Sequence, residues 1–230
     1  GDDYGVGKQI FRVDVRKKVL GFGQYPDDIT EKDYPDMCYA SAVRSKYARA
    51  RVVKIDSSKA CAMEGVIGVL TAADVPHNQV GHLIQDWDVM IAEGDVTRCI
   101  GDAVCLVVAE TPEILEKAKK AVKVTWEELE PVRNIEEARA EGAPRIHDSF
   151  FAFGNTVQLK DNVCQSRHVT RGDAKTALAN AAHRVTRTFT TPFTEHAFLE
   201  PECCVAMPYK DGVKIMSTDQ GAYDTRKECA

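Results

Sequence analysis

The stretch from residue 103 to 126 constrains the fold most, because three different patterns follow one another in it without a break. A continuous apolar run from Ala103 to Ala109 predicts a strand covered on both faces. Thr111 then caps a helix whose first position is Pro112. Residues 122 to 126 alternate between apolar and polar side chains, which indicates a second strand. A chain with this strand–helix–strand unit must contain a mixed α/β domain.

The surrounding sequence extends this unit. The helix has one apolar face, formed by Ile114, Leu115, Ala118, Ala121 and Val122. Apolar runs predict further strands at residues 37–43, 50–55 and 66–70, and a short helix ends at Gly65. Residues 77–98 carry little periodicity and predict an irregular excursion. Together these elements predict one compact domain from residue 14 to 130.

Composition excludes several classes of protein. The formal charge of −5 and the isoelectric point near 5.7 leave no basic surface for nucleic acid. No run of apolar residues is long enough to cross a membrane. The first residues lack the basic and then apolar pattern of a secretory signal. Together with cysteines that we expect to stay reduced, this predicts a cytoplasmic protein.

The eight cysteines include no C-x-x-C pair. Zinc and iron–sulfur sites usually draw ligands from such pairs, so we expect no metal site and interpret these thiols as small core side chains. His196 and Glu200 lie four residues apart, which is a ligand spacing only on a helix. Pro192 and Pro201 flank them, so metal ligation is disfavoured.

Beyond residue 130 the pattern weakens. Residues 131–170 predict a connector with one short helix at 134–141. From residue 171 a second unit begins, in which Asp173 caps a helix to Ala182. We expect its apolar side chains to face inward, and these are Ala174, Ala177, Leu178 and Ala181.

The last part of the chain predicts strands and a loop. Alternation from Val185 to Thr191 indicates one strand. Two more runs, 203–207 and 213–217, are separated by a turn at 210–212. The second run delivers Gln220 and Gly221 onto a loop.

In this order the segments resemble the molybdenum hydroxylases, the xanthine dehydrogenase and aldehyde oxidoreductase family. The segments that carry the resemblance are AVRSKYARARVVKIDSSKA, GVIGVLTAADVP, CIGDAVCLVVAETPEILEKAKKAVKVTWEELEPV, EHAFLEPE and STDQ. The resemblance implies an α/β (α+β) fold class. Residues 14–130 would form an α/β hammerhead domain and 131–170 a connector. Residues 171–230 would form the truncated start of a molybdopterin-binding domain.

The resemblance also implies a site. In the family a strand ending in STQ brings a glutamine amide beside the molybdenum centre, where it donates to an oxygen on the metal. Here one residue separates Thr218 from Gln220, so Gln220 and Gly221 are the expected cofactor-binding residues. Phe198 and Leu199 are expected to pack as scaffold near the centre. No complete catalytic set lies in this chain, because the family's base glutamate and cofactor loop are expected beyond Ala230.

The implied cofactor is molybdopterin-bound molybdenum, with [2Fe–2S] clusters and FAD on partner domains or subunits. The 230-residue chain alone is expected to bind none of them and to be inactive without the rest of the molybdenum-binding subunit. We expect oxygen insertion into a small molecule by a xanthine (purine) dehydrogenase. The alternatives are an aldehyde, nicotinate or another N-heterocycle as substrate, or a non-catalytic hammerhead module for subunit assembly. The residues do not separate these substrates, whereas the encoded sequence after Ala230 would separate enzyme from module.

Overall fold

A computed structural model describes residues 5–152 and 154–230, and these divide into two compact units. The larger comprises Cys38–Phe193 with the last residues from Lys227, and the smaller combines the chain up to Met37 with Thr194–Arg226. Each unit is described by itself below.

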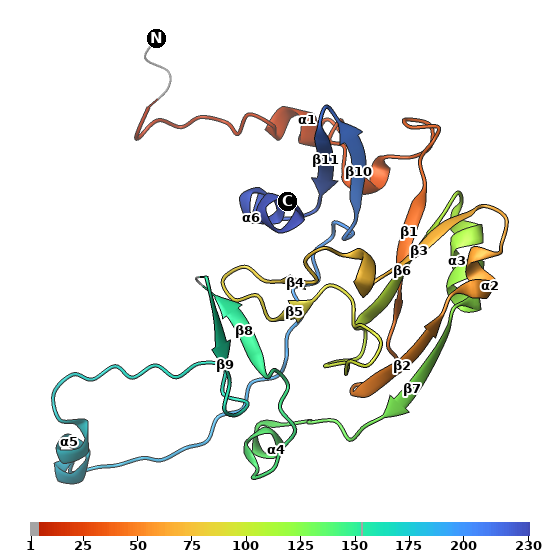
Figure 1. Cartoon of the computed structure of the whole chain (residues 1–230). Helices are drawn as coiled ribbons and strands as arrows, with labels where there is room; N and C mark the ends of the chain where they lie inside the picture. Colours follow the sequence, from red (N-terminus) through yellow and green to blue (C-terminus); the bar gives the residue numbers. More distant parts are fainter. Residues whose placement is uncertain (1–4, 153) are drawn as a thin grey trace. The chain divides into compact units, whose positions relative to one another are not determined.

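The central strand of the larger unit is β6 (Ala103–Ala109), which is the continuous apolar run that the sequence predicts as a strand. It pairs antiparallel with β1 (Tyr39–Arg44) on one side and β3 (Val66–Thr71) on the other, in the order β1–β6–β3 (Figure 1). Val104 and Val107, which point to opposite faces, are fully buried. The predicted strand with two covered faces is therefore confirmed.

The helix α3 (Pro112–Ala121) begins where the sequence predicts. The Thr111 hydroxyl oxygen accepts a hydrogen bond from the Ile114 N–H at 3.3 Å, which satisfies a donor that the first turn leaves free. Leu115 and Ala118 are buried, and α3 packs against β6 and β1 with α2 (Ser58–Cys61) beside it (Figure 1). The predicted apolar face is thus the face that covers the sheet.

After α3 the chain does not return to the same sheet. β7 (Lys123–Glu128) pairs antiparallel with β2 (Ala50–Asp56), and the rings of Tyr47 and Trp126 meet edge to face at 5.8 Å. The order strand–helix–strand is as predicted, but its two strands lie in different sheets. Every strand pair among the described residues is antiparallel, which makes the architecture α+β.

The rest of the larger unit contains short elements. They are η2 (Ala72–Asp74), β4 (Gln79–Val80), β5 (Trp87–Asp88), α4 (Ile135–Arg139), β8 (Ser149–Ala152), β9 (Asn155–Gln158) and α5 (Ala174–Asn180). Residues 77–98 are irregular apart from the small β4–β5 hairpin, as expected. The connector is held by the Asn162 amide, which donates to the carbonyls of Ala138 and Pro144 at 2.9 and 3.0 Å.

Two predictions for the end of this unit are wrong. The apolar side chains of α5 are exposed rather than inward, and Leu178 keeps 62% of its surface accessible. No strand forms from Val185 to Thr191, where the backbone is extended without a partner. The helix would have needed a sheet to pack against, and the strand would have needed a partner strand. The described residues bring neither to this segment.

The smaller unit contains α1 (Val15–Val19), η1 (Pro26–Asp28), the strands β10 (Cys204–Tyr209) and β11 (Gly212–Ser217), and most of α6 (Ala222–Cys229). β10 and β11 form the predicted hairpin, and Lys210 in its turn has φ 52°. β10 also contacts η1. No described side chain of this unit is buried.

The division into a hammerhead at 14–130, a connector at 131–170 and a last domain from 171 stays a prediction. Within the described part of the chain, no helix combines the length and apolarity needed to cross a bilayer.

Candidate functional site

Gln220 and Gly221, the two residues singled out by the resemblance, follow β11 at the end of the β10–β11 hairpin that is opposite its turn. Hydrogen bonds between Cys203 and Thr218 hold the two chain segments together at this end. The Thr218 N–H donates to the Cys203 carbonyl at 3.3 Å, and the Cys203 N–H donates to the Thr218 hydroxyl at 3.4 Å. The predicted loop is therefore confirmed, and it starts from a defined strand register.

The loop itself is organised by Asp219. One carboxylate oxygen accepts from the Ser217 hydroxyl, and the other accepts from the Gly221 N–H at 2.8 Å. The hydrogen bond from the Ser217 hydroxyl, with those from the Gly221 N–H and the Thr225 hydroxyl, lowers the pKa of Asp219, although burial opposes this shift. The carboxylate is therefore ionised at neutral pH.

Gln220 differs from its neighbours. Its side chain is exposed and makes no hydrogen bond within the described residues. Ser217, Thr218 and Asp219, by contrast, all use their side chains inside the loop. The structure thus presents one neutral amide, with a free N–H₂ donor and a free carbonyl acceptor, at the end of a strand.

Gly221 follows this amide and precedes α6. Its carbonyl accepts from the N–H groups of Asp224 and Thr225 at 2.9 and 3.0 Å, so the helix begins here. A Cβ atom at this position would lie 3.6 Å from the Asp224 carboxylate, an ordinary contact. Nothing within the described chain therefore requires glycine, and the space beside Gln220 is open. A neutral donor next to open space fits the oxygen-bearing group that the resemblance implies.

The segment 195–200 is not helical, so His196 and Glu200 do not share a helix face. The Glu195 carboxylate instead accepts from the His196 N–H at 3.0 Å. Phe198 and Leu199 are expected to pack, but they are 58% and 100% exposed.

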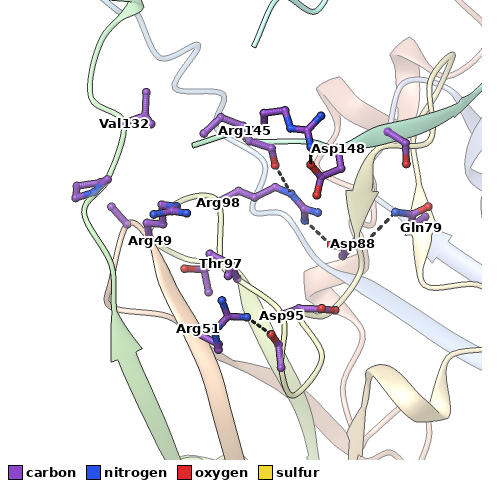
Figure 2. A pocket seen from close by; sticks show the side chains of 16 residues that line it. Arg49, Arg51, Gln79, Asp88, Asp95, Thr97, Arg98, Val132, Arg145 and Asp148 are labelled. Carbon is purple, nitrogen blue, oxygen red and sulfur yellow. Dashed lines mark hydrogen bonds and ion pairs between the residues drawn. The ribbon is translucent and has the colours of Figure 1, made fainter. Parts of the chain in front are cut away.

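A polar cavity of about 490 Å³ lies in the larger unit, between the strand end at Arg49 and the connector (Figure 2). Four guanidinium groups line it, and each donates to a main-chain carbonyl. The pairs are Arg49 with Glu130, Arg51 with Gly94, Arg98 with Ile146 and Arg145 with Leu159. Three of the four are also ion-paired, to Glu127, Asp88 and Asp148. Among these contacts, the bond from Arg98 to the Ile146 carbonyl joins the irregular loop at residue 98 to the connector, and the ion pairs neutralise most of the charge of the arginines.

Sequence reasoning missed this cavity. Arg49 and Arg51 are two residues apart, so they share a face wherever the chain is extended, and that signal was available. Arg98 and Arg145 come from an irregular loop and from the connector, and no local pattern places them beside a strand end.

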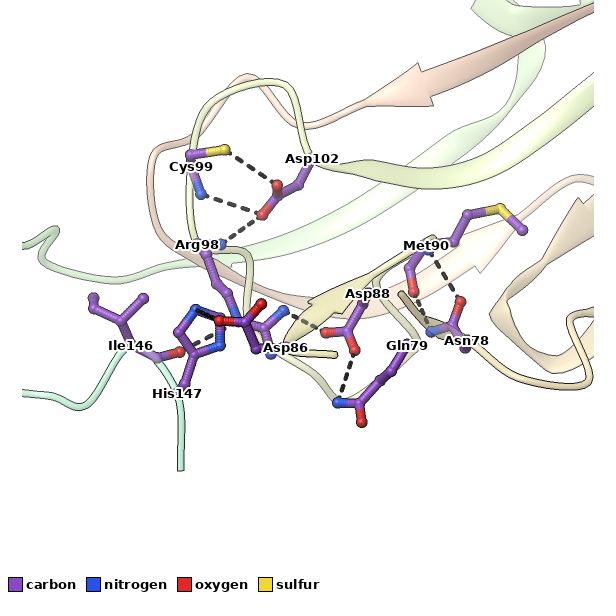
Figure 3. Close-up of polar contacts among 10 residues, drawn as sticks. All are labelled: Asn78, Gln79, Asp86, Asp88, Met90, Arg98, Cys99, Asp102, Ile146 and His147. Atoms are coloured by element: carbon purple, nitrogen blue, oxygen red, sulfur yellow. Dashed lines mark hydrogen bonds and ion pairs between the residues drawn. The ribbon is translucent and has the colours of Figure 1, made fainter. Parts of the chain in front are cut away.

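A partly buried network supports the same junction (Figure 3). Asp88 pairs with Arg98, and Asp102 accepts from the N–H groups of Arg98 and Cys99 at 2.6 and 3.2 Å. His147 from the connector lies 4.0 Å from the Asp86 carboxylate. Burial, and then the Arg98 charge, lower the pKa of His147.

The cysteines form no metal site. Within residues 5–152 and 154–230, no group of three His, Cys, Asp or Glu side chains could hold an ion. Burial raises the pKa of the Cys105 thiol to about 11, which makes it inert. The interpretation of the cysteines as core side chains holds only for Cys105, since Cys203 is half-buried and the other six are exposed. The Cys204 side chain lies on the exposed face of β10, in a hairpin that covers no core.

Two family models match the chain. Residues 20–130 match the a/b hammerhead domain of aldehyde oxidase and xanthine dehydrogenase, and residues 156–230 match the molybdopterin cofactor-binding domain.

Relatives and solved structures agree with these matches. The chain is 34% identical over 228 residues to the nicotinate dehydrogenase large molybdopterin subunit of Eubacterium barkeri, a match that covers 97% of this chain and 50% of that protein. It is 33% identical over 202 residues to a probable xanthine dehydrogenase subunit of Bacillus subtilis (strain 168), with 87% and 25% covered. Its fold superimposes on the aldehyde oxidoreductase from Desulfovibrio gigas with a TM-score of 0.71 at 25% identity, over 90% of this chain and 23% of that one.

The chain spans half or less of the length of these proteins. The antiparallel hammerhead sheet, the hairpin that carries Gln220 and the two family matches agree with one another. The chain belongs to the aldehyde oxidase and xanthine dehydrogenase family of molybdenum hydroxylases, with that family's α/β hammerhead domain followed by molybdopterin-binding sequence.

Proposed function

We propose that this chain is part of a molybdenum-dependent hydroxylase that inserts water-derived oxygen at an electron-poor carbon. The observation that carries the proposal is the free amide of Gln220, the side chain that remains without a partner in a loop whose other polar side chains are engaged. It lies within the segment that matches the molybdopterin cofactor-binding domain.

The bound molybdenum–pterin group would supply the two-electron redox chemistry of the reaction. Gln220 would hold that group through its amide N–H, a donor that stabilises an oxygen atom without adding charge. Gly221 would leave room beside the amide, because it has no side chain. The β10–β11 hairpin would fix the loop, since Cys203 and Thr218 close its end. Iron–sulfur and flavin groups on partner domains or subunits would supply the onward electron-transfer chemistry.

The substrate that we propose is an N-heterocycle. Two of the relatives are a nicotinate dehydrogenase and a probable xanthine dehydrogenase, which are named for N-heterocyclic compounds. We put xanthine first, with nicotinate as the alternative. The match of residues 156–230 to a cofactor-binding domain supports an enzyme over a hammerhead that serves assembly alone.

The test is Gln220→Ala in the complete enzyme that carries this chain. We expect turnover per bound molybdenum to fall by roughly ten- to a thousand-fold, the range for removal of one such donor. Folding and molybdenum content should stay close to normal, because the Gln220 side chain is exposed and has no partner in the described chain. Rates with xanthine, nicotinate and an aldehyde, each measured in the same preparation, decide the substrate class.

The matched control is Gln158→Ala, which removes an exposed glutamine side chain from β9. It should leave turnover unchanged. Equal rates for the Gln220 and Gln158 variants would contradict the proposed role of Gln220.

A further inference from the structure

The carboxylate of Asp219 joins two elements that flank Gln220. Ser217 is the last residue of β11, and its hydroxyl donates to one oxygen of Asp219. Gly221 immediately precedes α6, and its N–H donates to the other oxygen at 2.8 Å. Thr225, in the first turn of α6, adds a third donor. The end of the strand and the start of the helix are therefore tied to one side chain.

Gln220 lies inside this arrangement. The bond from the Gly221 N–H back to Asp219 closes a turn in which Gln220 is the single intervening residue. Such a turn restricts the backbone of the enclosed residue, and thereby the direction in which its side chain leaves the loop. The amide of Gln220 remains free to contact another group.

We propose that Asp219 is a positioning residue that fixes the Gln220 amide in the orientation used to hold the cofactor. This proposal rests on the function proposed above for Gln220. Asp219 acts through its neighbour's backbone and touches no reacting atom itself.

An ionised carboxylate suits this role better than any other side chain of its length. It only accepts, and its two oxygens offer about four acceptor positions, enough for the N–H and both hydroxyls. Asparagine keeps one oxygen for the Gly221 N–H but replaces the second oxygen with a donor. Alanine removes both. The strength of the loop contacts, and with it turnover, should therefore decrease from the wild type with Asp219 to Asp219→Asn and then to Asp219→Ala.

The position of Asp219 argues against a role in general stability. The side chain is on an exposed loop, and the smaller unit has no buried side chain among its described residues. Removal of one exposed charge from such a loop changes global stability little. An effect of Asp219 on turnover would therefore have to pass through the loop itself.

The experiment combines amide hydrogen exchange with a double-mutant cycle in the complete molybdenum enzyme that carries this chain. In Asp219→Ala the Gly221 N–H should exchange about three- to tenfold faster, as expected for the loss of one hydrogen bond. Asp219→Asn should change this exchange by less than about twofold, because one acceptor oxygen remains for the same N–H. The control Asp211→Ala removes the same charge at the turn end of the same hairpin and should leave Gly221 unchanged.

The kinetic part distinguishes positioning from mere loop damage. Asp219→Ala should lower kcat about three- to tenfold, and Asp219→Asn should restore most of it. The double variant Asp219→Ala/Gln220→Ala should be no slower than Gln220→Ala alone, because positioning an absent amide has no effect.

Each failure has its own meaning. Unchanged exchange at Gly221, or losses that multiply in the double variant, would overturn the role of Asp219 while leaving Gln220 in place. Normal turnover in Gln220→Ala would overturn both proposals, and the exchange data would still show whether Asp219 closes the loop.

Discussion

The helices α3 and α5 are alike in their local sequence signals but differ in burial. In both, a side chain at the cap accepts from a first-turn N–H: Thr111 from Ile114 at 3.3 Å, and Asp173 from Thr176 at 3.0 Å. Both also carry one apolar face. Leu115 of α3 is 6% exposed, whereas Leu178 of α5 is 62% exposed.

The difference comes from the strands each helix can reach. α3 follows β6 directly and packs on the sheet that β6 forms with β1, a strand from much earlier in the chain. α5 is flanked by extended segments, and no described strand offers it a face. Capping and amphipathic spacing thus predict that a helix forms, but burial depends on partners from elsewhere in the chain.

The largest effect that would sharpen this comparison is expected for Val107→Asp. Val107 is fully buried at the centre of β6, so the substitution places an unpaired charge in the core. The cost is several kcal/mol, against a total stability of about 5–15 kcal/mol for a domain. We expect loss of the cooperative unfolding transition, measured by circular dichroism. Val213→Asp on β11, where the side chain is 66% exposed, should keep its structure.

The next largest effect compares the two leucines directly. Leu115→Ala should lower the free energy of unfolding by about 2–5 kcal/mol, because it leaves a cavity under α3. Leu178→Ala should change it by less than about 0.5 kcal/mol. Urea unfolding of both variants provides the measurement. Equal losses would show that α5 is covered in solution and that the comparison drawn above is wrong.

The hammerhead elements could be predicted because their signals are local. The run Ala103–Ala109, the cap at Thr111 and the alternation from Val122 to Trp126 each define an element without reference to the rest of the chain. The pairing could not be predicted in this way. β7 joins β2 rather than β6, and that choice depends on strands distant in sequence. The strand expected at Val185–Thr191 failed for the same reason.

The candidate site shows a sharper limit. The residues alone predicted the β10–β11 hairpin and the loop after it, but nothing in their pattern separates Gln220 from an ordinary turn residue. That distinction came from the family resemblance. The contacts of Asp219 could not be predicted from the sequence, because they depend on where the Ser217 hydroxyl and the Gly221 N–H point.

Limited proteolysis tests the predicted domain boundaries. Cleavage in exposed segments requires only local opening of the chain, which costs less free energy than global unfolding. We expect the first tryptic cuts within 131–170, at Arg167, in a stretch that is exposed and has no helix or strand. Sites in α3 and β7, such as Lys117 and Lys123, should be cut at least about tenfold more slowly, because cleavage there requires the core to open. Early cleavage between residues 103 and 126 would contradict the predicted hammerhead boundary.

The smallest effect expected is the pH dependence contributed by His147. Burial and the Arg98 charge lower its pKa in the folded protein, while Asp86 and Asp88 oppose this shift. In the unfolded chain the imidazole titrates near its ordinary value of about 6.5. Between the two pKa values the unfolded state binds more protons, so stability rises with pH in that window and is fully present above it. Acidification from about pH 7 to 5 should therefore weaken the junction between connector and hammerhead.

His147→Gln should remove this contribution to the pH dependence of the free energy of unfolding. The contribution corresponds to a difference of at most about one bound proton between the unfolded and folded states. Identical slopes for the wild type and His147→Gln would show that the network of Arg98 and Asp88 holds the junction without help from the imidazole.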